Sequence, residues 1–185
     1  MHDVRTFDRL ARLYDLAMWP ADPGAIERAL DAAERPVERV VDVGGGTGRV
    51  ARALDREVLV VDAAPGMVRR AAAHGPAVVG DASRLPLRDG AADAVLVVDA
   101  LHHFPDAAAA VDEAARALAS GGVLAVRDFD PTTLRGRGLV LAERLVGFDS
   151  TFRSADDLAE LFADAGLDAR VLERGFATTV VGVAR

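Results

Sequence analysis

The chain has 185 residues, 51% of them hydrophobic, and its 29 acidic and 22 basic residues give a net charge of −7. This length and composition indicate one globular domain rather than a disordered chain, and an acidic chain without a basic stripe is a poor candidate for binding nucleic acid. The chain has no cysteine, which excludes disulfides, thiolate metal sites and a cysteine nucleophile. It has no apolar run of about 18 residues, which excludes a membrane-spanning helix. It has no signal-peptide core, and we expect a cytoplasmic protein.

Two helices are predicted at the start of the chain. Apolar residues recur at helical spacing at Phe7, Leu10, Ala11, Tyr14 and Ala17. Pro20 and Pro23 end this helix, and a second begins over residues 26–33. Pro36 then separates the pair from the first strand, so the single domain 1–185 divides into a helical segment, 1–36, and a core, 37–185.

A strand, a glycine turn, a helix, a second strand and an acid follow one another over residues 39–62. The strands are the valine-rich runs 40–43 and 58–61. The turn between them carries Gly44, Gly46 and Gly48, whose missing side chains let backbone N–H groups approach a ligand. Asp62 closes the second strand, where a carboxylate can accept both hydrogen bonds of a ribose diol. This order predicts half of a nucleotide-binding α/β fold.

The glycine spacing indicates which nucleotide binds. A dinucleotide fingerprint would need a third glycine at Arg49, whereas the glycines here alternate as G-x-G-x-G. Asp42, two residues before Gly44, can face a ligand ammonium rather than a pyrophosphate. The stretch resembles the first motif, D/E-x-G-x-G-x-G, of the class I S-adenosylmethionine-dependent methyltransferases. The alternative is a glycine-rich turn that binds no ligand.

The resemblance implies S-adenosylmethionine as the cofactor. It assigns cofactor binding to Tyr14, Asp42, Gly44, Gly46, Gly48, Asp62, Ala63, Met67, Asp81, Ala82 and Asp99. In this family Tyr14 would lie near the methionine end, Met67 would pack on the adenine, and Asp81 would reach the adenine amino group. Tyr14 and Met67 are equally compatible with core packing, and Asp81 with capping a turn. The resemblance also implies that residues 1–36 form a lid over the acceptor.

Two adjacent histidines follow the most hydrophobic strand, 95–98, and its terminal Asp99. Residues 100–104 read A-L-H-H-F and resemble the version of this motif in ubiquinone- and menaquinone-type C-methyltransferases. No N-P-P-Y sequence follows the strand, which disfavours methylation of nucleobase amines. His103 is the candidate general base, because the ordinary pKa of histidine suits proton transfer near neutrality. The alternative is that one histidine packs while the other caps a helix or meets solvent. No cluster of histidine and carboxylate residues in the sequence indicates a metal.

The second half of the chain predicts further alternation of helices and strands. A helix spans 105–119 and is ended by Gly121 and Gly122, before a strand at 123–126. Leu141, Leu145 and Phe148 suggest a later helix, whose start two glycines weaken.

Two strands close the chain. Ser154 and Asp157 form a capping pair for the last helix. Strands 169–173 and 178–184 are joined by only about four residues, which permits a hairpin and forbids a parallel crossover. The sequence therefore predicts an α/β, Rossmann-like, seven-stranded and mostly parallel sheet with helices on both faces and a C-terminal antiparallel hairpin.

Together these expectations predict an S-adenosylmethionine-dependent methyltransferase that transfers a methyl group in line to a small, partly hydrophobic acceptor. Such an acceptor is favoured because the predicted lid is mostly apolar. Its apolar residues are Phe7, Leu10, Tyr14, Met18 and Trp19. Two alternatives remain: a non-catalytic S-adenosylmethionine-binding or regulatory protein, and a nicotinamide-dependent oxidoreductase. The expected partner is a small molecule, and the sequence does not indicate the oligomeric state.

Overall fold

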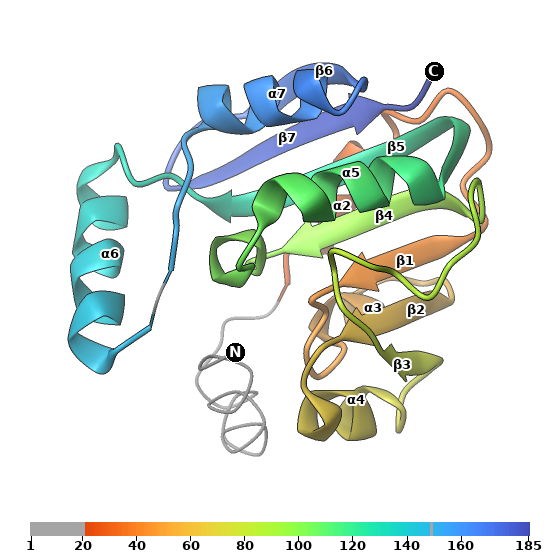
Figure 1. Ribbon diagram of the computed structural model, residues 1–185, viewed down its shortest axis with the longest axis horizontal. Helices are drawn as coiled ribbons and strands as arrows, with labels where there is room; N and C mark the ends of the chain where they lie inside the picture. Colours follow the sequence, from red (N-terminus) through yellow and green to blue (C-terminus); the bar gives the residue numbers. More distant parts are fainter. Residues whose placement is uncertain (1–20, 149) are drawn as a thin grey trace.

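The structure is a computed structural model that describes residues 21–148 and 150–185 (Figure 1). The predicted helix over 7–17, and with it Tyr14, lies outside the described residues. The strands are β1 Val40–Val43, β2 Val58–Asp62, β3 Ala77–Val79, β4 Ala92–Val98, β5 Leu118–Phe129, β6 Asp168–Glu173 and β7 Ala177–Val183. The helices are α2 Pro23–Leu30, α3 Arg49–Ala53, α4 Pro65–Ala71, the 3-10 turn η1 Leu101–His103, α5 Ala107–Ala117, α6 Leu134–Val146 and α7 Ala155–Asp164.

The strands form one sheet in the order β3-β2-β1-β4-β5-β7-β6. Strands β1 to β5 pair in parallel, and β7 pairs antiparallel with both β5 and β6. The fold class expected from the sequence is confirmed. The chain winds outward in opposite directions from β1 and β4, so their carboxyl ends flank the switch point where open α/β sheets bind ligands.

Two hydrophobic cores lie on opposite faces of the sheet. Alternate strand residues point to opposite faces, and β4 accordingly sends Val95 to the core under α5 and α7 and Leu96 to the core under α2 and α3. Helix α2 is the second of the two helices expected to precede the core. It buries Ile26 and Leu30 against the sheet and lines no part of the cavity described below.

The prediction that Gly121 and Gly122 end a helix is wrong. Helix α5 ends at Ala117, and β5 already begins at Leu118, which pairs with Ala92 of β4. Gly122 instead allows close approach of two strands, because a Cβ there would lie 2.8 Å from the carbonyl oxygen of Asp93. Pairing with β4 therefore outweighs the helical pattern of residues 118–119.

The predictions for the C-terminal part are largely confirmed. Ser154 and Asp157 form a reciprocal capping box at α7, and β6 and β7 form the antiparallel hairpin. Helix α6 begins earlier than its two glycines suggested, because the hydroxyl of Thr133 accepts a hydrogen bond from the N–H of Gly136 at 3.0 Å. Among the described residues, no helix has both the length and the apolarity needed to cross a bilayer.

Candidate functional site

A cavity lies at the carboxyl ends of β1, β2 and β4, at the switch point of the sheet. Its walls include nine residues singled out from the sequence: Gly44, Gly46, Asp62, Ala63, Met67, Asp81, Ala82, Asp99 and His103. They also include residues that the sequence did not single out: Val43, Val61, Ala64, Gly80, Ser83, Ala100, Phe104 and Pro105. Most of these additional residues are apolar and neighbour a predicted one in the chain, and apolar side chains alone carry no motif that would have marked them.

The glycine turn forms one wall of the cavity. Gly44 has a φ of +70°, and a Cβ there would lie 2.9 Å from the Cβ of Ala100 and 3.0 Å from the ring of Phe104. Gly46 also has a positive φ, of 57°. A side chain at Gly44 would therefore strain the turn and close the cavity, as a turn that must admit a ligand requires.

Asp62 connects the turn to the next helix. Its carboxylate accepts the N–H of Gly46 at 2.9 Å and the N–H of Ala64 at 2.8 Å. Burial raises the pKa of this carboxyl, and the two hydrogen bonds offset part of that effect. A carboxylate has about four acceptor positions, so Asp62 retains capacity for a ligand that enters the cavity.

Asp42 and Gly48 are the two described residues of the predicted set that do not line the cavity. Gly48 precedes α3 with a φ of +82°. Asp42 is fully buried beneath the turn, and neither of its carboxylate oxygens has a hydrogen-bond partner among the described residues. Burial, together with the negative charge of Asp62, raises the pKa of Asp42 to about 7.

Gly45 has a role that the motif did not reveal. A Cβ at this position would overlap the carboxylate of Asp42, at 2.6 Å from its Cγ. The glycine is therefore required by the buried acid, whereas the alternating motif treats its position as variable.

An ion pair at the end of β4 was missed from the sequence. Asp99 lines the cavity with a φ of +53°, and its carboxylate accepts a hydrogen bond from the guanidinium of Arg49 at 3.0 Å. Positive φ is uncommon for residues other than glycine, and such strain is often found at functional sites. The only signal in the sequence was that Arg49 stands where a dinucleotide fingerprint has its third glycine.

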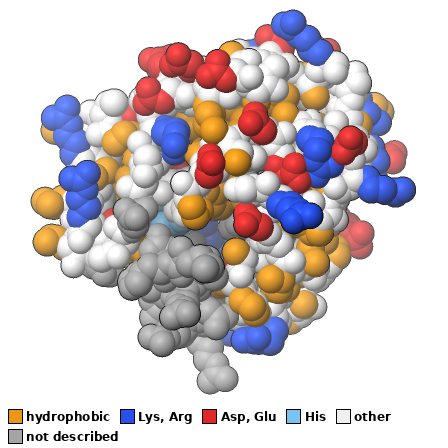
Figure 2. Space-filling view, viewed as in Figure 1, with side chains coloured by type: hydrophobic (Ala, Val, Ile, Leu, Met, Phe, Trp, Pro, Cys, Tyr) orange, Lys and Arg blue, Asp and Glu red, His pale blue; other side chains and the backbone are white. Residues whose placement is uncertain are grey.

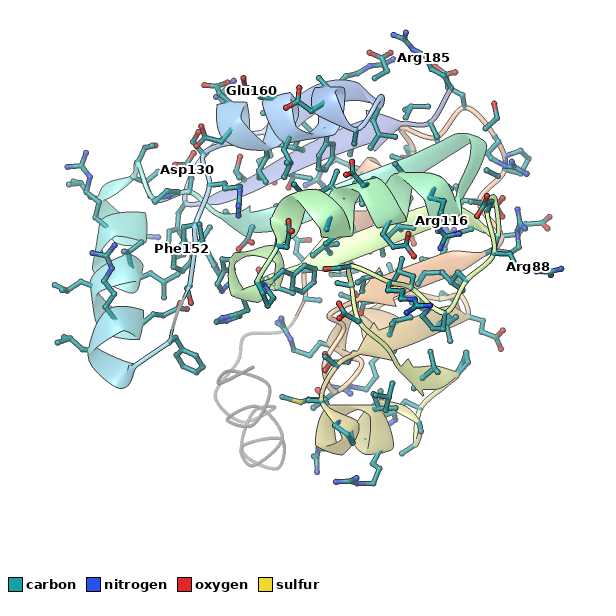
Figure 3. The ribbon with its side chains drawn as sticks, viewed as in Figure 1. Arg88, Arg116, Asp130, Phe152, Glu160 and Arg185 are labelled. Carbon is teal, nitrogen blue, oxygen red and sulfur yellow. The ribbon has the colours of Figure 1, made fainter. Side chains whose placement is uncertain are left out.

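The two histidines of η1 have different surroundings. His102 is buried, and its Nδ1 lies 2.6 Å from one carboxylate oxygen of Asp128, whose other carboxylate oxygen accepts the backbone N–H of His102 at 3.1 Å. Its ring stacks on Phe152, which Figure 3 shows in the segment between α6 and α7. Burial lowers the pKa of His102, but Asp128 and Glu143 outweigh it, so the pKa is raised. This pair fixes η1 to the end of β5.

His103 lines the cavity, and its Nδ1 lies 3.2 Å from the hydroxyl of Ser150. Burial, together with the neighbouring His102, lowers the pKa of His103 to about 3. The ring is therefore neutral at pH 7 and a much weaker base than its ordinary pKa suggested.

Ligand atoms of His102, His103 and Glu143 lie within 4.8 Å of one another. Glu143 comes from α6, about forty residues from the histidines, so the sequence did not indicate this group. Its Oε1 lies 3.7 Å from the Nε2 of His102. The contact joins the inner face of α6 to η1, and the expectation that no metal binds remains a prediction.

Comparisons with known proteins agree with this geometry. Residues 41–126 match the family model described as a methyltransferase domain. A demethylmenaquinone methyltransferase of Thermus thermophilus is 38% identical over 151 residues, which cover 72% of this chain and 69% of that protein. Several other curated relatives are longer still, and the chain spans 43% to 58% of their length.

Two solved structures show the same fold. A Thermotoga maritima S-adenosylmethionine-dependent methyltransferase, described as a possible histamine N-methyltransferase, has a TM-score of 0.79 at 24% identity, covering 97% of this chain and 98% of that one. An O-methyltransferase of neocarzinostatin biosynthesis, solved with S-adenosylhomocysteine and 1,4-dihydroxy-2-naphthoic acid, has a TM-score of 0.73 at 27% identity, covering all of this chain and 61% of that one. With the switch-point cavity, the glycine turn and Asp62, these similarities show that the chain belongs to the class I S-adenosylmethionine-dependent methyltransferases.

Proposed function

We propose that this methyltransferase acts on a small, partly hydrophobic acceptor that enters at the end of β4. The cavity carries this proposal, because it joins the carboxylate of Asp62 to an apolar wall formed by Ala100, Phe104 and Pro105. Two similar proteins support it: one is named for demethylmenaquinone, and the other was solved with a dihydroxynaphthoic acid.

The residues of the cavity fit S-adenosylmethionine. Gly44 leaves space along the turn that a Cβ would fill, Gly46 lines the same cavity with a positive φ, and Asp62 keeps acceptor capacity for the two hydroxyls of a ribose. Met67 is buried and lines the wall, where it suits contact with an adenine ring. Asp81 uses one carboxylate oxygen to accept the N–H of Ser83, and its other oxygen suits the adenine amino group.

The bound cofactor supplies an activated methyl group and its own leaving group. The residues of this chain therefore need only to align the reactants and to keep water away. Asp62 and Asp81 would hold the two ends of the nucleoside, while Phe104 and Pro105 form an apolar wall beside His103. A general base is needed only where the acceptor must lose a proton.

A binding and turnover assay tests this function. S-adenosylhomocysteine should raise the melting temperature of the protein, whereas NAD should not, since the turn lacks a dinucleotide fingerprint. A panel of phenols, naphthoic acids and quinols should yield at least one methylated product that incorporates label from methyl-labelled S-adenosylmethionine. Stabilisation by NAD would favour an oxidoreductase, and cofactor binding without turnover of any acceptor would favour a regulatory protein.

The low pKa of His103 predicts a small effect of its removal. His103→Ala should lower turnover less than about threefold and leave any limb of the pH–rate profile near neutrality in place, because a base with a pKa of about 3 produces no such limb. The measurement is kcat against pH with a known acceptor. A loss of about 10²- to 10⁴-fold together with the limb would identify His103 as the general base.

The acidic net charge supports the further proposal that nucleic acid is not a partner.

A further inference from the structure

Helix α6 carries three of its four leucines on the outside. The side chains of Leu134, Leu141 and Leu145 are 87%, 60% and 80% exposed. Only two other large hydrophobic residues of the described chain are comparably exposed, Val79 and Leu172. Figure 1 shows α6 at the edge of the molecule, away from the sheet. Apolar side chains gathered on one exposed helix mark an interaction surface more often than isolated ones do.

The three leucines form one stripe. At 3.6 residues per turn, positions 134, 138, 141 and 145 lie on the same side of a helix. Position 138 is Gly138, and a Cβ there would meet nothing within 4 Å. The opposite side faces the protein, since Gly136 is buried and Glu143 contacts His102. The stripe is therefore continuous and faces away from the core.

Arginines flank the stripe on both sides. By helical position, Arg137 and Arg144 lie along one side and Arg135 along the other. All three are exposed, and none forms an ion pair with a described residue. With Glu143 as its one acid, α6 has a net charge of +2 in a chain whose net charge is −7. Figure 2 shows hydrophobic and basic side chains together along the edge where Figure 1 places α6.

We propose that this stripe docks α6 on a bilayer surface that contains anionic lipid. A helix with leucines on one side and arginines beside them lies in the interface, with its apolar side in the acyl boundary and its cations among the headgroups. A second copy of the chain fits less well, because a two-fold pairing of the stripes would bring arginines on both sides toward the arginines of the partner. His102 contacts the side of α6 that faces away from the stripe. Docking would therefore hold His102 one helix diameter, about 10–12 Å, from the bilayer surface.

Sedimentation with vesicles tests the proposal without knowledge of the acceptor. Wild-type protein should bind vesicles of phosphatidylglycerol and phosphatidylcholine at least tenfold more tightly than vesicles of phosphatidylcholine alone, and salt should weaken the binding. The variant Leu134→Gln/Leu141→Gln/Leu145→Gln should lose at least tenfold. The variant Arg135→Gln/Arg137→Gln/Arg144→Gln should lose the preference for anionic lipid. The matched control is Val79→Gln/Leu172→Gln, which changes the other two exposed residues and should bind as the wild type does.

Two readouts would overturn the proposal. One is binding by the leucine variant that equals wild-type binding. The other is a wild-type dimer in sedimentation velocity that the leucine variant converts to a monomer, with no vesicle binding by either protein. Because all three leucines are exposed, their replacement should leave the melting temperature unchanged. The arginine variant provides a second test, because it changes the charge beside the stripe and leaves the leucines in place.

Discussion

Asp42→Asn should raise the free energy of unfolding by about 4 kcal/mol at pH 8.5 and leave it nearly unchanged at pH 4. Burial, with the charge of Asp62, raises the pKa of Asp42 from 3.8 to about 7, and this difference corresponds to about 4 kcal/mol. Between these two values the folded protein keeps a proton that the unfolded chain has lost. Stability from this group is therefore present below pH 4 and is lost as the pH rises through about 7.

The measurement is guanidinium-induced unfolding of both proteins, without cofactor, from pH 4 to 8.5. The opposite shift of His103, whose pKa is lowered to about 3, affects both proteins equally and cancels in the difference. Asp55→Asn, at an exposed acid, is the matched control and should follow the wild type. If the stabilities of Asp42→Asn and wild type differ by the same amount at every pH, the buried carboxyl does not titrate as described.

Asp62→Ala should weaken binding of S-adenosylhomocysteine by about 1–3 kcal/mol, or roughly 5- to 150-fold. In the proposed binding mode, the substitution would leave the two ribose hydroxyls without an acceptor. It also removes the carboxylate that accepts the N–H groups of Gly46 and Ala64, so the turn loses its link to α4. Calorimetry at a single pH measures the change, with Asp164→Ala, at an exposed acid, as the control.

A ligand series separates the two effects of this substitution. Wild-type protein should prefer S-adenosylhomocysteine to its 2′-deoxy analogue, which lacks the ribose 2′-hydroxyl. Asp62→Ala should bind the two ligands equally, because it has no carboxylate to accept that hydroxyl. The difference between the two proteins therefore isolates the contact of Asp62 with the 2′-hydroxyl. Unchanged affinity for S-adenosylhomocysteine in Asp62→Ala would exclude Asp62 from the binding site. Equal discrimination by both proteins would show that Asp62 acts only through the turn.

Helix α6 illustrates why a periodic pattern does not orient a helix. Leu141 and Leu145 predicted a helix, and the helix is there, but these side chains face outward. Periodicity identifies which residues share a side, whereas contact with η1 through Glu143 decides which side faces the protein. In the same way, the pattern of residues 118–119 suited a helix until β4 offered Leu118 a pairing partner.

The sequence by itself determined the turn after β1, Asp62 at the end of β2, the capping box of α7 and the terminal hairpin. Each depends on neighbours in the chain: a glycine where a side chain would clash, an acid after a strand, a serine three residues before its partner, a link too short for a crossover. The tertiary structure alone decided the pairing of Arg49 with Asp99, the contact of His102 with Asp128, and the burial that moves the pKa values of Asp42 and His103 in opposite directions. These properties depend on desolvation and on charges brought together from distant parts of the chain, and no local pattern of residues specifies them.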